Sequence, residues 1–298
     1  MLFKNKHIKK YSYQILGLFA SVRGYTLLTI IVAQYLSARY IFAPQHTWNQ
    51  ILFDQKLFML VLATSFAIAG GYLINNFYDA EKDQINRPHK YFLENRVSAS
   101  FQLLCYGIMN FCSLVLSVIV SLRTLPFFGI YIFGLWLYSH LLKKQFWASN
   151  VFAVLLAVTP FFAITLYLKN FSSIVFYHGA FLFLVVLIRD LIKDLENFKG
   201  DWVREYKTIA VVFGETTTKK VITFLALLTF IPIQLLLNQK EVLGTMWYYF
   251  LIAIPFLLLI VLILWKSPCQ KTYLWLHNLL KLLIVTGILS IVLIRFPL

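Results

Sequence analysis

Long apolar runs alternate with short polar links along almost the whole chain. Each run has about 20 residues, which is the length that an α-helix needs to cross roughly 30 Å of hydrocarbon. The pattern predicts nine membrane-spanning helices, at about 15–38, 57–78, 99–121, 125–142, 150–168, 172–193, 219–238, 245–265 and 276–296. We therefore expect an all-α, polytopic membrane protein in which residues 1–298 form a single transmembrane domain.

Two of the polar links are longer than the others. They cover residues 79–98, after the second predicted span, and residues 194–218, after the sixth. The remaining links are too short to hold a separate soluble domain. We expect these two links to be loops that lie on the same side of the membrane.

Composition agrees with this fold class, because 60% of the residues are hydrophobic, only 13% are charged and the mean hydropathy is +0.75. A soluble domain has about 25% charged residues. The net charge of +15 would suggest nucleic acid as a partner of a soluble protein. Here the basic residues lie in the links between spans, so membrane topology and anionic ligands explain them better. We expect membrane lipids, and no nucleic acid, among the partners.

The distribution of basic residues predicts the orientation of the chain. Nineteen of them lie on the side of the N-terminus and six on the other side. The excess marks the cytoplasmic side, so we expect a multi-pass protein of the cell membrane. Its N-terminus is then cytoplasmic, and its C-terminus lies on the opposite side. Both long polar links are cytoplasmic in this topology.

Acidic residues are concentrated in two segments, which contain ten of the twelve in the chain. In the first segment Asn75, Asp79 and Asp83 are each four residues apart. On a helix this spacing places their side chains on one face. The second segment repeats the arrangement with four side chains at i, i+4, i+7 and i+11: Asp190, Asp194, Asn197 and Asp201. Two oxygen-rich faces at the ends of apolar helices predict one polyvalent cation site between them.

The residue types in these segments indicate which ion and which ligand. Carboxylate and amide oxygens are hard ligands of the kind that Mg²⁺ takes, usually together with water and phosphate oxygens. Basic side chains flank the acids: Arg87, Lys90, Arg189, Lys193, Lys199 and Arg204. Acidic side chains can bind the metal ion, and the neighbouring basic side chains can bind phosphate oxygens. Together they predict a site for a metal-bound diphosphate. The alternative is a pair of solvated helix ends whose charges form mutual salt bridges.

The two segments resemble the signatures of the UbiA superfamily of intramembrane prenyltransferases. The family's first signature is NDxxDxxxD followed by I-N-(R/K)-P, and here Asn75, Asp79, Asp83 and the run at 85–88 match in order. The second signature, in one branch, reads KDxEDxxGD, and this chain has KDLENFKGD at 193–201. That branch includes digeranylgeranylglyceryl phosphate synthases, chlorophyll synthases and homogentisate prenyltransferases. Weaker similarities are Arg23, Tyr138-Ser139, Leu142-Lys143 and Asn150.

The resemblance implies a fold of about nine helices around a central cavity with a cytoplasmic cap. It implies that Mg²⁺ helps an allylic diphosphate, such as geranylgeranyl diphosphate, to ionise, and that a lipophilic acceptor attacks the resulting cation. Catalytic residues are then Asp79, Asp83, Asp194 and Asp201, and the metal ligands are these four with Asn75 and Asn197. Residues implied in substrate binding are Arg23, Asn75, Arg87, Lys90, Tyr138, Lys143, Lys193 and Arg204.

The chain departs from the family pattern at two positions. Asn76 and Asn197 stand where the family commonly has Asp, so each face loses one formal charge. These departures leave a non-catalytic relative open as an alternative. Two further alternatives are a membrane terpene cyclase on the same scaffold and a cation-coupled transporter. The second signature favours one branch of the family, but it identifies neither the acceptor nor the length of the isoprenoid.

Overall fold

The structure is a computed structural model that describes residues 17–86, 91–92, 98–145, 149–203, 205–266 and 269–297. For residues 81–83, 85–86 and 145 it describes the backbone alone. Within these ranges most residues are helical and none forms a strand. The predicted all-α class is therefore confirmed.

The helices follow one another along the chain with short connections. Their bounds are α2 Gly24–Ser37, η1 Ala38–Phe42, α3 Trp48–Leu52, α4 Gln55–Asn86, α6 Ala99–Val120, α7 Thr124–Leu137, η2 Tyr138–Leu142, α8 Lys143–Gln145, α9 Ser149–Leu168, α10 Ser173–Val203, α11 Ile209–Leu228, α12 Phe230–Leu237, α13 Lys240–Leu243, η3 Gly244–Met246, α14 Trp247–Lys266, α15 Gln270–Ser290 and η4 Ile291–Arg295. The segments η1 and η2 are π-helical, and η3 and η4 are 3₁₀-helical.

In the described part of the chain, 8 helices are long and apolar enough to cross a membrane. They correspond one by one to the predicted spans from 57–78 to 276–296. The first predicted span, 15–38, begins outside the described residues and continues as α2 and η1. The protein is thus a multi-pass membrane protein.

The structure differs from the prediction at the starts of the two long polar links, 79–98 and 194–218, which were expected to be loops. Helix α4 has 32 residues and α10 has 31. At 1.5 Å per residue each is about 46–48 Å long, well beyond the roughly 30 Å of the hydrocarbon core. The first parts of these links are therefore the ends of long helices that continue past the apolar region.

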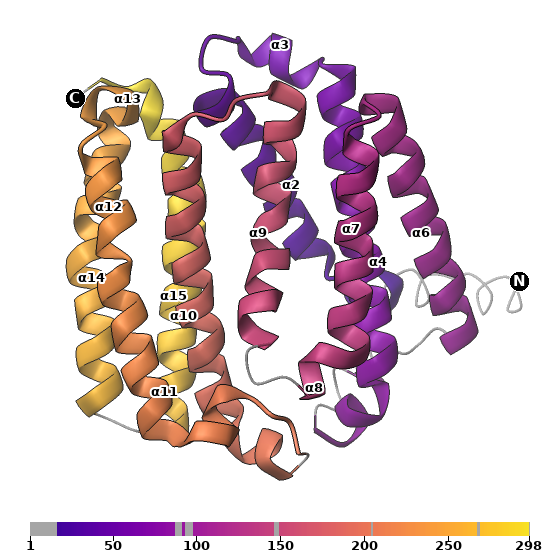
Figure 1. Cartoon of the computed structure of the whole chain (residues 1–298), viewed down its shortest axis with the longest axis vertical. Helices are drawn as coiled ribbons and strands as arrows, with labels where there is room; N and C mark the ends of the chain where they lie inside the picture. Colours follow the sequence, from indigo (N-terminus) through magenta and orange to yellow (C-terminus); the bar gives the residue numbers. More distant parts are fainter. Residues whose placement is uncertain are drawn as a thin grey trace, which may run out of the picture. The chain divides into compact units, whose positions relative to one another are not determined.

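The chain divides into two compact units, and each is described by itself. The first runs from Met1–Val32 and Phe53–His140, and the second from Ala33–Leu52 and Leu141–Leu298. In the first unit α4 packs against α6 and α7 (Figure 1). A Cβ at Gly70 would lie 2.7 Å from Asn110 Oδ1, so glycine lets α4 and α6 approach closely at this point. Ser113 Oγ also donates to Ala63 O at 2.8 Å.

The second unit is built around α10, which packs against α9, α11, α12 and α15 (Figure 1). The apolar positions 188, 191, 192 and 195 of α10 are buried, at i, i+3, i+4 and i+7. This spacing is one face of a helix, so the polar residues between these positions necessarily face another way. The amphipathic end of α10 therefore holds a fixed rotation, which determines where its acidic side chains point.

Candidate functional site

The first acidic segment forms the helical face that its spacing predicts. Asn75 Nδ2 donates to Asp79 Oδ2 at 3.2 Å, one turn further along α4. Asp79 is buried, with 7% of its surface exposed. An acidic side chain at this depth is costly unless hydrogen-bond donors or a cation lie near it. The pair is the start of an oxygen-rich surface on the polar end of α4.

Asn76, one of the two departures from the family pattern, points elsewhere. Its Nδ2 donates to Gln102 Oε1 of α6 at 3.4 Å, and both side chains are buried. The Oδ1 atom of Asn76 has no hydrogen-bond partner and is buried. The residue thus takes part in the packing of α4 against α6. Its amide donates a hydrogen bond there that a carboxylate could not donate.

Two of the predicted substrate-binding residues lie close to this part of α4. The Arg23 guanidinium lies 4.9 Å from the centroid of the Tyr72 ring, one turn before Asn76. Tyr138 begins the π-helical turn η2, and two residues later the His140 ring lies 5.1 Å from that of Tyr78. Since Tyr78 directly precedes Asp79, the turn that carries Tyr138 packs beside the first acidic segment. Lys143, the remaining candidate of this stretch, begins α8.

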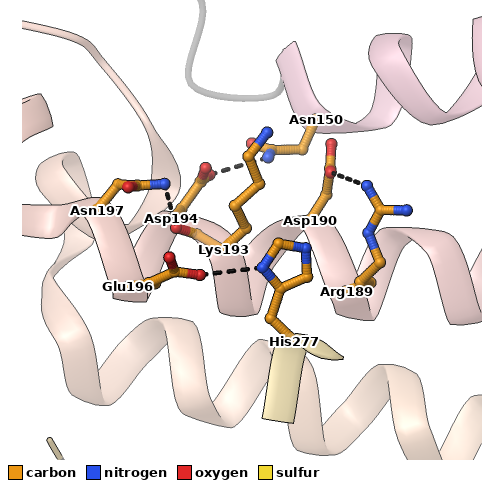
Figure 2. Close-up of polar contacts among 8 residues, drawn as sticks. All are labelled: Asn150, Arg189, Asp190, Lys193, Asp194, Glu196, Asn197 and His277. Atoms are coloured by element: carbon orange, nitrogen blue, oxygen red, sulfur yellow. Dashed lines mark hydrogen bonds and ion pairs between the residues drawn. The ribbon is translucent and has the colours of Figure 1, made fainter. Parts of the chain in front are cut away.

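In the second unit the acidic face of α10 meets the start of α9 (Figure 2). Asn150 Nδ2 donates to Asp194 Oδ2 at 2.9 Å. Asn150 was predicted only as a weak similarity to the family, and its contact with Asp194 is apparent only in the structure. The hydrogen bond joins residues 44 positions apart and fixes the direction of the carboxylate.

The other residues of this face have distinct surroundings. Asn197 Nδ2 donates to Lys193 O of its own helix at 2.9 Å, which leaves its Oδ1 turned away from the helix backbone (Figure 2). Asp201 is 9% exposed, and its carbonyl accepts from Tyr206 N where the chain leaves α10. Arg189 Nη2 lies 3.7 Å from Asp190 Oδ1, too far for a strong hydrogen bond.

Glu196 and His277 form a pair that sequence reasoning did not find. The Nδ1 atom of His277, on α15, lies 3.0 Å from Glu196 Oε2 (Figure 2). Gln270 Nε2 also donates to the carbonyl of Glu196. Glu196 is two residues after Asp194, or about 200° around the helix, so the pair braces the back of the acidic face. Spacing within one segment cannot predict a partner 81 residues away.

Some predicted residues lie outside the described part of the chain. These are Arg87, Lys90 and Arg204, together with the side chain of Asp83. Asp79 belongs to one unit and Asp194 to the other. The convergence of the two acidic segments on one metal site therefore stays a prediction.

The candidate metal-ligand atoms that the structure describes are of the kind that binds a hard cation. Among the described residues no three His, Cys, Asp or Glu side chains form a group of metal ligands. Carboxylates are instead interleaved with amides: Asn75 beside Asp79, and Asn150 and Asn197 beside Asp194. Carboxylate and amide oxygens that are buried or partly buried, without sulfur or imidazole ligands, fit Mg²⁺.

Comparison with known proteins gives one family match that covers most of the chain. The model of the UbiA prenyltransferase family matches residues 26–285. Digeranylgeranylglyceryl phosphate synthase of Sulfurisphaera tokodaii is 27% identical over 191 residues, which are 59% of this chain and 66% of that protein. The synthase of Korarchaeum cryptofilum is 26% identical over 250 residues, which are 82% of this chain and 88% of that protein. The match to the first relative thus spans slightly less than two thirds of its length.

Solved structures agree with this result at the level of the fold. A structure concerned with digeranylgeranylglyceryl phosphate synthase in membranes has a TM-score of 0.75 at 20% identity, covering 93% of this chain and 97% of that chain. A UbiA homolog from Archaeoglobus fulgidus bound to GPP and Mg²⁺ has a TM-score of 0.67 at 16% identity, covering 93% and 99%. The predicted resemblance is confirmed.

Proposed function

The chain belongs to the UbiA prenyltransferase family, and on that premise we propose that it transfers an isoprenoid chain from an allylic prenyl diphosphate to a lipophilic acceptor within the membrane. The observation that carries the proposal is the hydrogen bond between Asp194, which is partly buried, and the buried Asn150 at the polar end of α10. Carboxylate and amide oxygens at the polar end of a membrane helix are ligands that suit a diphosphate-bound Mg²⁺. The relatives named as synthases and the homolog bound to GPP and Mg²⁺ support the same reaction class.

Each predicted residue has a role in this proposal. Asp79, Asp194 and Asp201 would hold the divalent cation together with Asn75, Asn197 and Asp83. When bound, the cation neutralises the charge that develops on the departing diphosphate. Basic side chains would bind the phosphate oxygens directly: Arg23, Arg87, Lys90, Lys143, Lys193 and Arg204. Tyr138 would lie near the allylic end of the substrate, where an aromatic face favours a cation.

For the acceptor we propose an isoprenoid ether of glycerol phosphate, with geranylgeranyl diphosphate as donor. The relatives that support this choice are named digeranylgeranylglyceryl phosphate synthase. We further propose that the protein lies in the cell membrane with its N-terminus in the cytoplasm. The charge asymmetry of the links supports this orientation, and it puts both acidic helix ends on the side where soluble diphosphates are made.

The test is an acceptor panel with the full chain in lipid nanodiscs and geranylgeranyl diphosphate as donor. Products are identified by mass spectrometry with Mg²⁺, and again with excess EDTA. We expect a prenylated lipid that requires both Mg²⁺ and the glycerol phosphate acceptor. The Asp194→Asn variant is the control for contaminating activity.

Two outcomes would contradict the proposal in different ways. A hydrocarbon product formed without any acceptor would assign a terpene cyclase. No consumption of diphosphate by a folded, Mg²⁺-loaded protein with any acceptor would assign a non-catalytic relative.

A further inference from the structure

Asn150, the second residue of α9, is buried with only 6% of its surface exposed. Half of its side-chain amide has a partner, because Nδ2 donates to Asp194 Oδ2 at 2.9 Å. The other half has none: Oδ1 is buried and accepts no hydrogen bond in the structure. The amide is held by the Asp194 carboxylate, which fixes where its unpartnered oxygen lies (Figure 2).

An unpartnered amide oxygen is costly in a protein interior, and most such groups have a protein or water partner. Asn150 could avoid this cost only if something else approached Oδ1. The nearest functional groups on α10 are Asp194 itself and Lys193, which extends on the same side of the helix (Figure 2). Asp190, four residues before Asp194, belongs to the same helical face. The oxygen therefore lies beside the acidic face of α10, in a region that also holds the Lys193 side chain (Figure 2).

We propose that Asn150 is a further residue of the metal site, whose Oδ1 faces the divalent cation or one of its bound waters while its Nδ2 positions Asp194. The inference rests on the proposed function, since it takes the acidic face of α10 as the cation site. An amide oxygen is a hard ligand, and it also accepts hydrogen bonds from the waters that Mg²⁺ keeps. It would add an oxygen where the described carboxylates alone do not form a group of three.

The competing explanation is that Asn150 only ties α9 to α10. The same unit offers a matched residue for comparison, because Asn170 lies just beyond the other end of α9. Asn170 Nδ2 donates to Phe42 O at 2.7 Å, and its Oδ1 accepts from Ser172 N at 3.0 Å. Both halves of that amide have partners within the protein. Asn170 is therefore a structural asparagine, whereas the Oδ1 atom of Asn150 has no partner within the protein.

The experiment measures cation binding rather than turnover. The full chain in nanodiscs is titrated with Mn²⁺ in the presence of inorganic diphosphate, and free Mn²⁺ is followed by electron paramagnetic resonance. Thermal unfolding is recorded with and without the ion. The variants are Asn150→Ala, Asn150→Asp and the control Asn170→Ala.

We expect Asn150→Ala to raise the half-saturating Mn²⁺ concentration about 10- to 100-fold, as loss of a supporting residue does in metal sites. Asn150→Asp keeps an oxygen of the same size and adds charge, so its half-saturation should equal that of the wild type or fall below it. Without metal the same variant should unfold at a lower temperature, because two carboxylates then face each other. Asn170→Ala should lose stability and bind Mn²⁺ like the wild type.

Equal half-saturation in the wild type and in Asn150→Ala would overturn this inference and leave the proposed function intact. If Asn150→Ala does not fold, weaker binding in Asn150→Asp than in the wild type would overturn it instead. A wild-type protein that binds no Mn²⁺ even with diphosphate would refute the metal site itself, and with it the proposed function.

Discussion

The imidazole of His277 and the carboxylate of Glu196 meet at 3.0 Å on the side of α10 that faces away from Asp194. His277 is buried, with 7% of its surface exposed, and Glu196 is partly buried. The segment of α10 that carries the predicted metal ligands on one face is thus tied to α15 through its other face (Figure 2). Removing the His277 side chain should therefore weaken the packing of α10 against α15 and leave Asp190, Asp194 and Asp201 unchanged.

His277→Ala should lower the free energy of unfolding by about 1–3 kcal/mol, because it leaves the half-buried Glu196 carboxylate without its partner. His277→Gln, which keeps a donor, should recover part of this loss. Unfolding of the variants in nanodiscs, followed by circular dichroism, gives the measurement. Gln270→Ala, which affects only the bond to the Glu196 carbonyl, is the control. Equal stability of His277→Ala and the wild type would show that the pair contributes nothing.

Asp79→Ala and Asp201→Ala should each reduce the rate of prenyl transfer on the order of 10²–10³-fold while the protein stays folded. The cation's charge is needed most when the diphosphate leaves, so losing a ligand raises the barrier more than it weakens substrate binding. The measurement is the initial rate across a Mg²⁺ titration, with unfolding temperatures recorded in parallel. Rates near the wild type for both variants would remove the acids from the mechanism.

The predicted convergence of the two acidic segments can be tested by a double variant. If Asp79 and Asp194 bind the same cation cluster, replacing both with Asn should cost much less than the product of the two single losses. We expect the single variants to approach the rate of the double variant. The control pairs Asp79→Asn with Glu241→Gln, in which the second residue lies in the short helix α13. Multiplicative losses for Asp79 and Asp194 would indicate independent sites.

Asn76→Asp restores the acid that the family commonly has. A carboxylate cannot donate to Gln102 Oε1, so we expect it to turn toward Asp79, one helical turn away, and the variant to keep activity at a lower Mg²⁺ concentration. The structure adds a second expectation. Asn76 Nδ2 now donates to Gln102 Oε1, and a buried carboxylate at position 76 would lose that bond. Unfolding without metal should therefore occur at a lower temperature than in the wild type. A higher Mg²⁺ requirement than in the wild type would contradict the first expectation.

Gly244→Ala should destabilise the second unit without altering metal binding. Gly244 has φ +51, and a Cβ there would lie 2.7 Å from the carbonyl of Ile294 and in contact with that of Phe296. Strain of this kind costs about 1–3 kcal/mol. Gly129→Ala is a matched control, since a Cβ at Gly129 meets no atom within 4 Å. Unfolding temperatures of the two variants provide the comparison, and similar values would contradict the prediction.

The sequence alone determined the membrane class and most of the span positions. The length of a hydrophobic run reflects the thickness of the bilayer. Side chains that face the hydrocarbon core are mostly apolar, because no water is present there to hydrogen-bond with polar groups. Spacing by four also predicted the Asn75–Asp79 contact, since local periodicity fixes which side chains stack on one helix. Hydropathy did not reveal that α4 and α10 continue beyond the apolar region, because it reports the end of the membrane rather than the end of a helix.

Only the tertiary structure decided which residues meet across helices. Asn150 contacts Asp194, Gln102 contacts Asn76 and His277 contacts Glu196, at separations of 44, 26 and 81 residues. These pairs depend on how each helix is rotated and how far it slides along its neighbour. Packing of apolar faces sets both quantities, and no periodicity within one segment encodes them. The acids could therefore be found from the sequence, whereas the residues that position them could not.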